Sequence, residues 1–116
     1  MTRGRLYVTT TISPAMLDSN IRPIMELHEI DFDTGYRIAK ANNFFHGNVG
    51  HRNTADMLGV LLHMKPERLF GRKNLKLKVG DRVLAFIPQF RDTRTREFTD
   101  EEIQNMVFRI FYAEMK

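Results

Sequence analysis

The sequence predicts an α/β fold, a single domain in which a mixed β-sheet of about five strands carries helices packed on it. Its 116 residues fit one ordinary domain, and a hydrophobic content of 42% is enough to fill one core. Segments rich in β-branched and aromatic residues alternate with segments of helical periodicity. Two strand-like segments are adjacent and the others are joined through helices, which predicts antiparallel and parallel pairs in one sheet.

The N-terminal part of the chain predicts two strands and a helix. A first, central strand is expected from about Arg5 to Ile12, because RLYVTTTI is rich in β-branched and aromatic residues and SPAMLDSN, which follows, is typical of turns. PIMELHEIDF, residues 23–32, predicts a second strand. Asp33 is then expected to cap a short helix through Ala41, which the glycine-bearing loop NNFFHGNVG ends.

A second helix and a hairpin follow. The apolar residues of NTADMLGVLLHM recur at helical spacing and predict a helix that packs on the core, ending before Pro66. They are Met57, Leu58, Leu61 and Leu62. In NLKLKVGDRVLAFIPQF, apolar residues alternate with lysines over 75–79, Gly80-Asp81 forms a turn, and 83–87 is continuously apolar. This pattern predicts a β-hairpin.

The C-terminal part predicts a polar excursion, a short helix and a last strand. RDTRTRE is polar and basic, and Thr99 with Glu102 forms a capping box that opens a short helix. VFRIFYAEM predicts the last strand.

Charge favours anionic partners. Eighteen Lys and Arg against fourteen Asp and Glu give a formal net charge of +4, and ten basic but only three acidic residues lie between Lys65 and Arg96. This third of the chain is either a phosphate-binding surface or a solvated basic face. The absence of cysteine excludes disulfides and cysteine nucleophiles and suits a reducing, intracellular compartment. No apolar stretch reaches about 18 residues, so we expect a soluble protein without a membrane.

The most informative single residue is His51, which lies between Gly50 and the predicted helix. Backbone N–H groups at a helix start and an imidazole can converge on an anion. Gly47 and Gly50 have no Cβ to block close approach of a ligand to the backbone. The alternative is a histidine that only caps the helix or lies on the surface.

Metal chemistry and a catalytic triad are disfavoured. His46 and His51 are five residues apart without a third ligand nearby, whereas a catalytic zinc ion needs three protein ligands. Ser13 and His51 could enter a triad with some carboxylate, but no nucleophile elbow supports it. Arg91, Arg94 and Arg96 are more suggestive, because guanidinium groups bind phosphate oxygens in a bidentate manner, although a solvated loop is the alternative.

The combined order of LYVTTTIS, GNVGHRNTADML, LKLKVGDRVLAFIPQFR and FTDEEI resembles the viral anti-CRISPR ring nuclease family. The resemblance extends from about Leu6 to Tyr112, and its sharpest mark is Gly-His followed three residues on by Thr. Members degrade cyclic tetra-adenylate, the second messenger of type III CRISPR defence. The resemblance implies a ring nuclease that needs no metal or cofactor and acts in the cytoplasm of an infected prokaryotic host.

Site residues follow from the same resemblance. It implies that His51 is the general acid and that Arg91 contacts the transition state. The residues expected to bind the ligand are Thr10, Ser13, Gly50, Arg72 and Arg94. Many members carry a glutamate where this chain has Arg94, with Glu97 three residues further on, and an asparagine where it has Thr10.

The implied reaction uses only side chains and substrate. A ribose 2′-hydroxyl attacks the adjacent phosphorus, His51 protonates the leaving 5′-oxygen, and the products are linear with a 2′,3′-cyclic phosphate. A homodimer with two sites facing a symmetric ring is implied as well. Two other functions fit the same residues: a sponge that sequesters a cyclic nucleotide without cleaving it, and a viral regulator that binds RNA or DNA.

Overall fold

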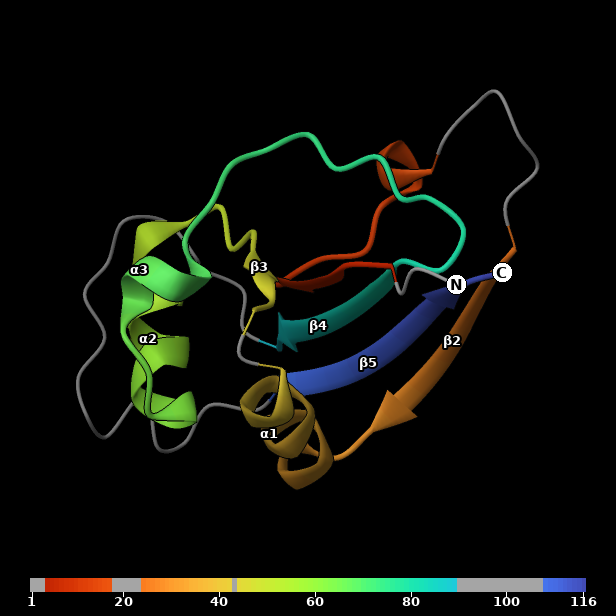
Figure 1. Ribbon diagram of the computed structural model, residues 1–116. Helices are drawn as coiled ribbons and strands as arrows, with labels where there is room; N and C mark the ends of the chain where they lie inside the picture. Colours follow the sequence, from red (N-terminus) through yellow and green to blue (C-terminus); the bar gives the residue numbers. More distant parts are fainter. Residues whose placement is uncertain (1–3, 18–23, 43, 90–107) are drawn as a thin grey trace.

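The computed structural model describes residues 4–17, 24–42, 44–89 and 108–116 and shows an α/β fold with a five-stranded mixed sheet (Figure 1). The strands are β1 (Leu6–Thr9), β2 (Met25–Ile30), β3 (His46–Gly47), β4 (Arg82–Pro88) and β5 (Phe108–Met115). The helices are α1 (Phe32–Ala41), α2 (Arg52–Leu62) and α3 (Pro66–Leu69), with a 3₁₀ turn at Pro14–Met16. The predicted fold class is confirmed.

The strand order is β2-β5-β4-β1-β3. β1 runs parallel to β3 and β4, whereas β5 runs antiparallel to β4 and β2. β4 is the central strand, and its residues 83–86 are all buried, as expected for a strand covered on both faces. β1 has a partner on each side but lies one position from the edge, so it is internal rather than central.

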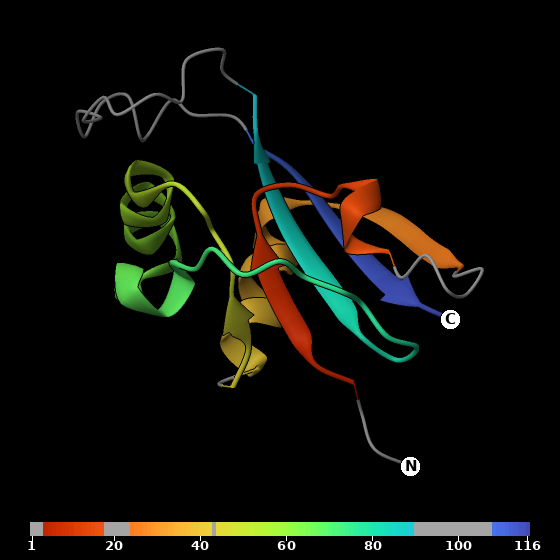
Figure 2. The same ribbon diagram turned by 90° about the horizontal axis from the view of Figure 1, so that it is seen from above.

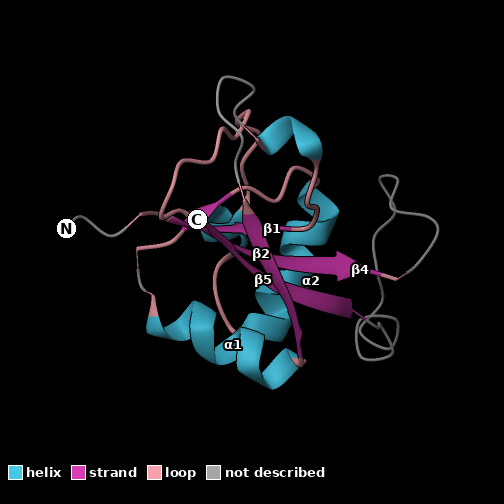
Figure 3. Cartoon of the chain, turned by 90° about the vertical axis from the view of Figure 1, so that its right-hand side faces the viewer, coloured by secondary structure: helices cyan, strands magenta, loops and turns pink. Residues whose placement is uncertain are grey.

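Each face of the sheet has its own hydrophobic layer. On one face, Val8, Leu84 and Phe86 pack with residues of α1 and α2. On the other face, Val83 and Ala85 pack with Leu75, Leu77 and the 3₁₀ turn. Figure 2 shows residues 70–80 crossing the sheet beside that turn, and Figure 3 shows α1 beneath the strands with loop segments above them.

The first helix begins earlier than predicted. Asp31, not Asp33, is its N-cap, and the Asp31 carboxylate accepts a hydrogen bond from Thr34 N at 2.7 Å. Hydrogen bonds from Thr34, first from its side chain and then from its backbone N–H, hold the pKa of Asp31 below its usual value. Asp33 lies in the first turn instead and pairs with Arg37 at 2.9 Å. Two acidic residues two positions apart offer equivalent capping signals, which is why the sequence misplaces the start.

The predicted hairpin is wrong. Residues 75–79 form no strand, and their one ladder contact is an isolated bridge from Leu77 to Leu17. They lie across the sheet with Leu75 and Leu77 buried and the lysines exposed, and this arrangement has the same alternation of period two as a strand. The turn itself is present, because Gly80 has a φ of 92° and the buried Asp81 carboxylate accepts bonds from Arg5 N and Lys78 N.

β3 lies in NNFFHGNVG, the segment that the sequence predicts to be a loop. His46 and Gly47 pair with Tyr7 and Val8 at the edge of the sheet. The capping box at Thr99 lies outside the described residues. Within the described ranges, no helix is long and apolar enough to cross a membrane.

Candidate active site

The carboxyl ends of the parallel strands form one edge of the sheet. β1, β3 and β4 share one direction, and α2 lies beyond their ends (Figure 1). Open α/β sheets bind ligands outside the carboxyl ends of parallel strands. β1 leads into residues 10–13, β3 leads into residues 48–51, and β4 ends at Pro88. The next predicted site residues, Arg91 and Arg94, lie outside the described part of the chain.

The exit of β1 carries Thr10 and Ser13. Thr10 is half-buried. Ser13 is the N-cap of the 3₁₀ turn, and its Oγ accepts a hydrogen bond from Ala15 N at 3.1 Å. A hydroxyl group still has a proton to donate when its oxygen accepts one bond. Ser13 therefore has a structural role that leaves its donor available for a phosphate.

The residues that follow β3, Asn48 and Val49, are hydrogen-bonded to residues 69–73. Val49 N donates to Leu69 O at 2.9 Å, and Gly71 N donates to Val49 O at 3.1 Å. The Asn48 amide donates to Lys73 O at 3.1 Å and accepts from Lys73 N at 2.9 Å. This pair of bonds, the Asn48–Lys73 clasp, holds the loop just before His51.

Arg72 extends the same attachment by one residue. Its Nε donates to Gly50 O at 2.8 Å, and its guanidinium carbon lies 5.6 Å from the centre of the Phe70 ring. One side of the guanidinium is thus engaged by the backbone, which leaves the terminal nitrogens for an anionic ligand. The structure thus brings Arg72 to Gly50, the residue before His51.

His51 is the N-cap residue of α2 by position only. Its carbonyl accepts the first helical hydrogen bond, from Ala55 N at 3.0 Å, but its side chain makes no capping bond. The side chain is exposed. The structure therefore does not show a capping imidazole, and the exposed side chain agrees with a surface histidine as well as with a ligand-binding one. The N-terminal end of an 11-residue helix adds a positive potential beside the ring.

The two glycines of the loop have different roles. A Cβ on Gly47 would lie 2.1 Å from Arg68 O, so this glycine accommodates α3 rather than a ligand, contrary to our expectation. A Cβ on Gly50 would meet nothing closer than 3.9 Å. The fold itself leaves space at Gly50, which is what an approaching ligand would need.

Acidic residues near the start of α2 are already paired. Arg52 contacts Asp56 at 3.4 Å and Glu67 at 3.1 Å. The backbone N–H of Glu67 and then Arg52 hold the pKa of the Glu67 carboxyl below its usual value. The described residues contain no group of three His, Cys, Asp or Glu placed to hold a metal ion.

Sequence reasoning missed the Asn48–Lys73 clasp. The partners are 25 residues apart, and neither belongs to a periodic pattern or a short motif. Only the pairing of residues 48–50 with 69–73 in space gives Asn48 its role.

Neither a protein-family model nor a curated protein sequence matches the chain. Among solved structures, B116 of Sulfolobus turreted icosahedral virus is similar, with a TM-score of 0.79 over 96% of this chain and 99% of that one. The sequence identity is 17%. The likeness shows a shared fold with a viral protein.

Proposed function

We propose that the protein is a metal-independent ring nuclease that cleaves cyclic tetra-adenylate and thereby switches off type III CRISPR defence in the cytoplasm of an infected prokaryotic host. The observation that carries the proposal is the placement of His51. Its exposed side chain is not used as a helix cap, and it stands at the start of α2 beside Arg72 and the carboxyl ends of the parallel strands. A viral protein of the same fold is consistent with this origin.

The chemistry assigns a separate task to each group. The ribose 2′-oxygen forms a bond to the adjacent phosphorus while the bond to the 5′-oxygen breaks, and the 2′-hydroxyl proton passes to solvent. Protonated His51 gives its proton to the departing 5′-oxygen. The product ends in a 2′,3′-cyclic phosphate, and the new 5′ end is a hydroxyl group.

Positive groups hold the phosphates. Arg72 is hydrogen-bonded to the residue before His51, and α2 begins at the residue after it. A guanidinium group and a helix N-terminus both favour negative charge. Arg91 is proposed to contact the non-bridging oxygens as their charge grows in the transition state. Thr10, Ser13 and Arg94 are proposed to bind the rest of the ligand.

A two-fold homodimer is part of the proposal. One His51 serves one phosphodiester, so two copies facing a symmetric ring would place two sites on its opposite edges. Light scattering of the pure protein measures this directly, and a monomer that retains full ring cleavage would contradict it.

The test is product analysis in excess EDTA. Cyclic tetra-adenylate incubated with the protein should yield linear fragments with a 2′,3′-cyclic phosphate. Tight binding without cleavage would instead show a cyclic-nucleotide sponge. If the protein ignores the ring and binds RNA or DNA, it is a nucleic-acid-binding regulator, and the ring nuclease proposal is wrong.

A further inference from the structure

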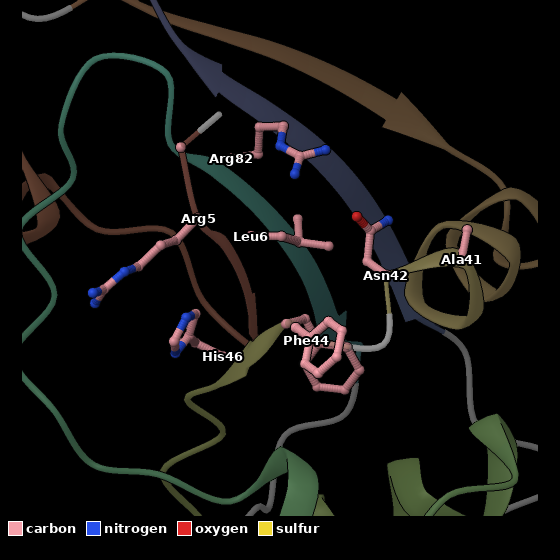
Figure 4. Close-up of a pocket in the computed structure, with 9 residues that line it drawn as sticks. Arg5, Leu6, Ala41, Asn42, Phe44, His46 and Arg82 are labelled. Atoms are coloured by element: carbon pink, nitrogen blue, oxygen red, sulfur yellow. The ribbon is translucent and has the colours of Figure 1, made fainter. Parts of the chain in front are cut away.

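Two hollows among the described residues lie on either side of Arg5 and His46. One, of about 500 Å³, is lined by Leu6, Phe44 and Arg82 on the α1 side of the sheet. The other, of about 350 Å³, lies on the opposite side, toward residues 70–75. Figure 4 shows Arg5 and His46 extending side by side in one direction, away from Arg82 and Asn42.

The walls of the smaller hollow follow from strand geometry. Arg5, just before β1, is two residues from Tyr7, and Asn48, just after β3, is two residues from His46. In extended backbone, residues two apart point to the same face of a sheet. Tyr7 is directly opposite His46 in the parallel register, and their ring centres are 5.5 Å apart at an interplanar angle of 39°. The floor of the hollow is therefore aromatic.

The rim of this hollow is cationic. Arg5, Arg68, Arg72 and Lys73 line it, and the one acidic lining residue, Glu67, is already paired with Arg52 at 3.1 Å. Arg5 uses its backbone N–H, not its guanidinium, to bond Asp81, and its side chain is exposed. Four cationic side chains and one acidic side chain therefore line this hollow, which makes the rim positive.

We propose that the smaller hollow is a second nucleotide-binding site, which adjoins the His51 site at Arg72 and takes a nucleoside monophosphate. The base lies against Tyr7 and His46, since flat rings stack favourably on aromatic side chains. The phosphate is held by Arg5 and Lys73 at the rim. A volume of about 350 Å³ lies within the usual range of small-ligand pockets.

Aromatic and cationic groups together favour a nucleotide over other anions. An inorganic phosphate would use the rim and leave the Tyr7–His46 floor uncovered. An acidic peptide would need an extended track of cations, whereas these cations surround one hollow. The chain's own fold explains the shape of the hollow, but it supplies no partner for the Arg5 guanidinium among the described residues.

Isothermal titration calorimetry of the full chain tests the site, with adenosine 5′-monophosphate, adenosine and inorganic phosphate as probes. We expect the monophosphate to bind at least about tenfold more tightly than either fragment, because it uses both the floor and the rim. Arg5→Ala and His46→Ala should each weaken its binding about tenfold or more, and His46→Phe should retain most of the affinity because a ring remains.

Matched controls separate this site from the proposed ring nuclease. Arg37→Ala removes an exposed arginine on α1 that pairs with Asp33, and it should leave monophosphate binding unchanged. His51→Ala should also leave it unchanged. Equal affinity for phosphate and monophosphate, displacement by an acidic peptide alone, or insensitivity to both Arg5→Ala and His46→Ala in folded variants would overturn the proposal, whatever the outcome for ring cleavage.

Discussion

Separate alanine substitutions at Gly50 and Gly47 distinguish a glycine that leaves space for a ligand from a glycine that the fold requires. A Cβ at position 47 would lie 2.1 Å from Arg68 O and 2.7 Å from Leu69 C, so the backbone of α3 would have to move. Overpacking of this kind destabilises by roughly 1–3 kcal/mol or more. We expect Gly47→Ala to lower the free energy of unfolding by at least about that amount.

Gly50→Ala should behave in the opposite way. The nearest atoms to its Cβ, Arg72 Cγ and Gly71 O, are 3.9 Å away, an ordinary van der Waals distance. Among the described glycines only Gly80 has a positive φ, so alanine adopts the backbone conformation at position 50. Alanine restricts the unfolded chain more than glycine does, and this raises the free energy of unfolding by about 0.4–1 kcal/mol. Stability should be unchanged or slightly raised.

Gly50→Ala should lower the cleavage rate without lowering the free energy of unfolding. The added methyl group stands at the point where the proposed phosphate approaches the backbone beside His51, and we expect single-turnover cleavage to fall roughly tenfold or more. Urea unfolding and single-turnover rates of both variants give the comparison. If Gly50→Ala loses as much stability as Gly47→Ala, or retains the full cleavage rate, the space at Gly50 does not serve a ligand.

Three further predictions concern the arginines, the turn and a helix end. Arg91→Ala should lower the single-turnover rate more than it weakens binding of the ligand. Arg94→Ala should weaken binding and flatten its salt dependence, and Arg94→Glu should preserve or raise turnover. A loss of the chemical step in Arg94→Ala with unchanged binding would contradict a binding role for Arg94. Asp81→Ala removes an acceptor that bonds two backbone N–H groups at 3.0 and 2.9 Å. Because Asp81 is buried, urea unfolding should show a loss of about 2–4 kcal/mol, and an unchanged midpoint would refute the importance of this turn. His63 ends α2 with φ 54° and ψ 48°, a conformation that glycine adopts without strain. His63→Gly should therefore raise the free energy of unfolding by up to about 1 kcal/mol, and a clear loss would show that the contact with Tyr36 matters more.

Strand and helix content could be predicted because apolar periodicity reports which side of a segment is buried. β4 and β5 were predicted nearly as they are observed, since long apolar or β-branched segments have few alternatives. The sequence misassigns residues 75–79 because Leu75 and Leu77 are buried and the lysines between them exposed, as in a strand, whereas Val79 is exposed. β3 was missed because two residues are too few to carry a pattern.

Part of the candidate site was predictable from local chemistry. A histidine between a glycine and an apolar helical run indicated a helix start, and the structure places His51 there. The hydrogen bond from Arg72 to Gly50 O joins residues 22 positions apart, so the sequence alone gave no reason for their proximity beyond the family resemblance. The same holds for the Tyr7–His46 pair, which depends on the register between β1 and β3.

The most direct test of the ring nuclease proposal is single-turnover cleavage of saturating cyclic tetra-adenylate in excess EDTA by His51→Ala, beside the wild-type chain. His28→Ala is the matched control, because His28 is an exposed histidine on β2 that contacts Glu26 at 2.7 Å. We expect a fall of roughly 10²–10⁴-fold in rate for His51→Ala, with ligand binding largely retained and no change for His28→Ala. An unchanged rate in His51→Ala, or activity that EDTA abolishes and one added metal ion restores, would contradict the ring nuclease proposal.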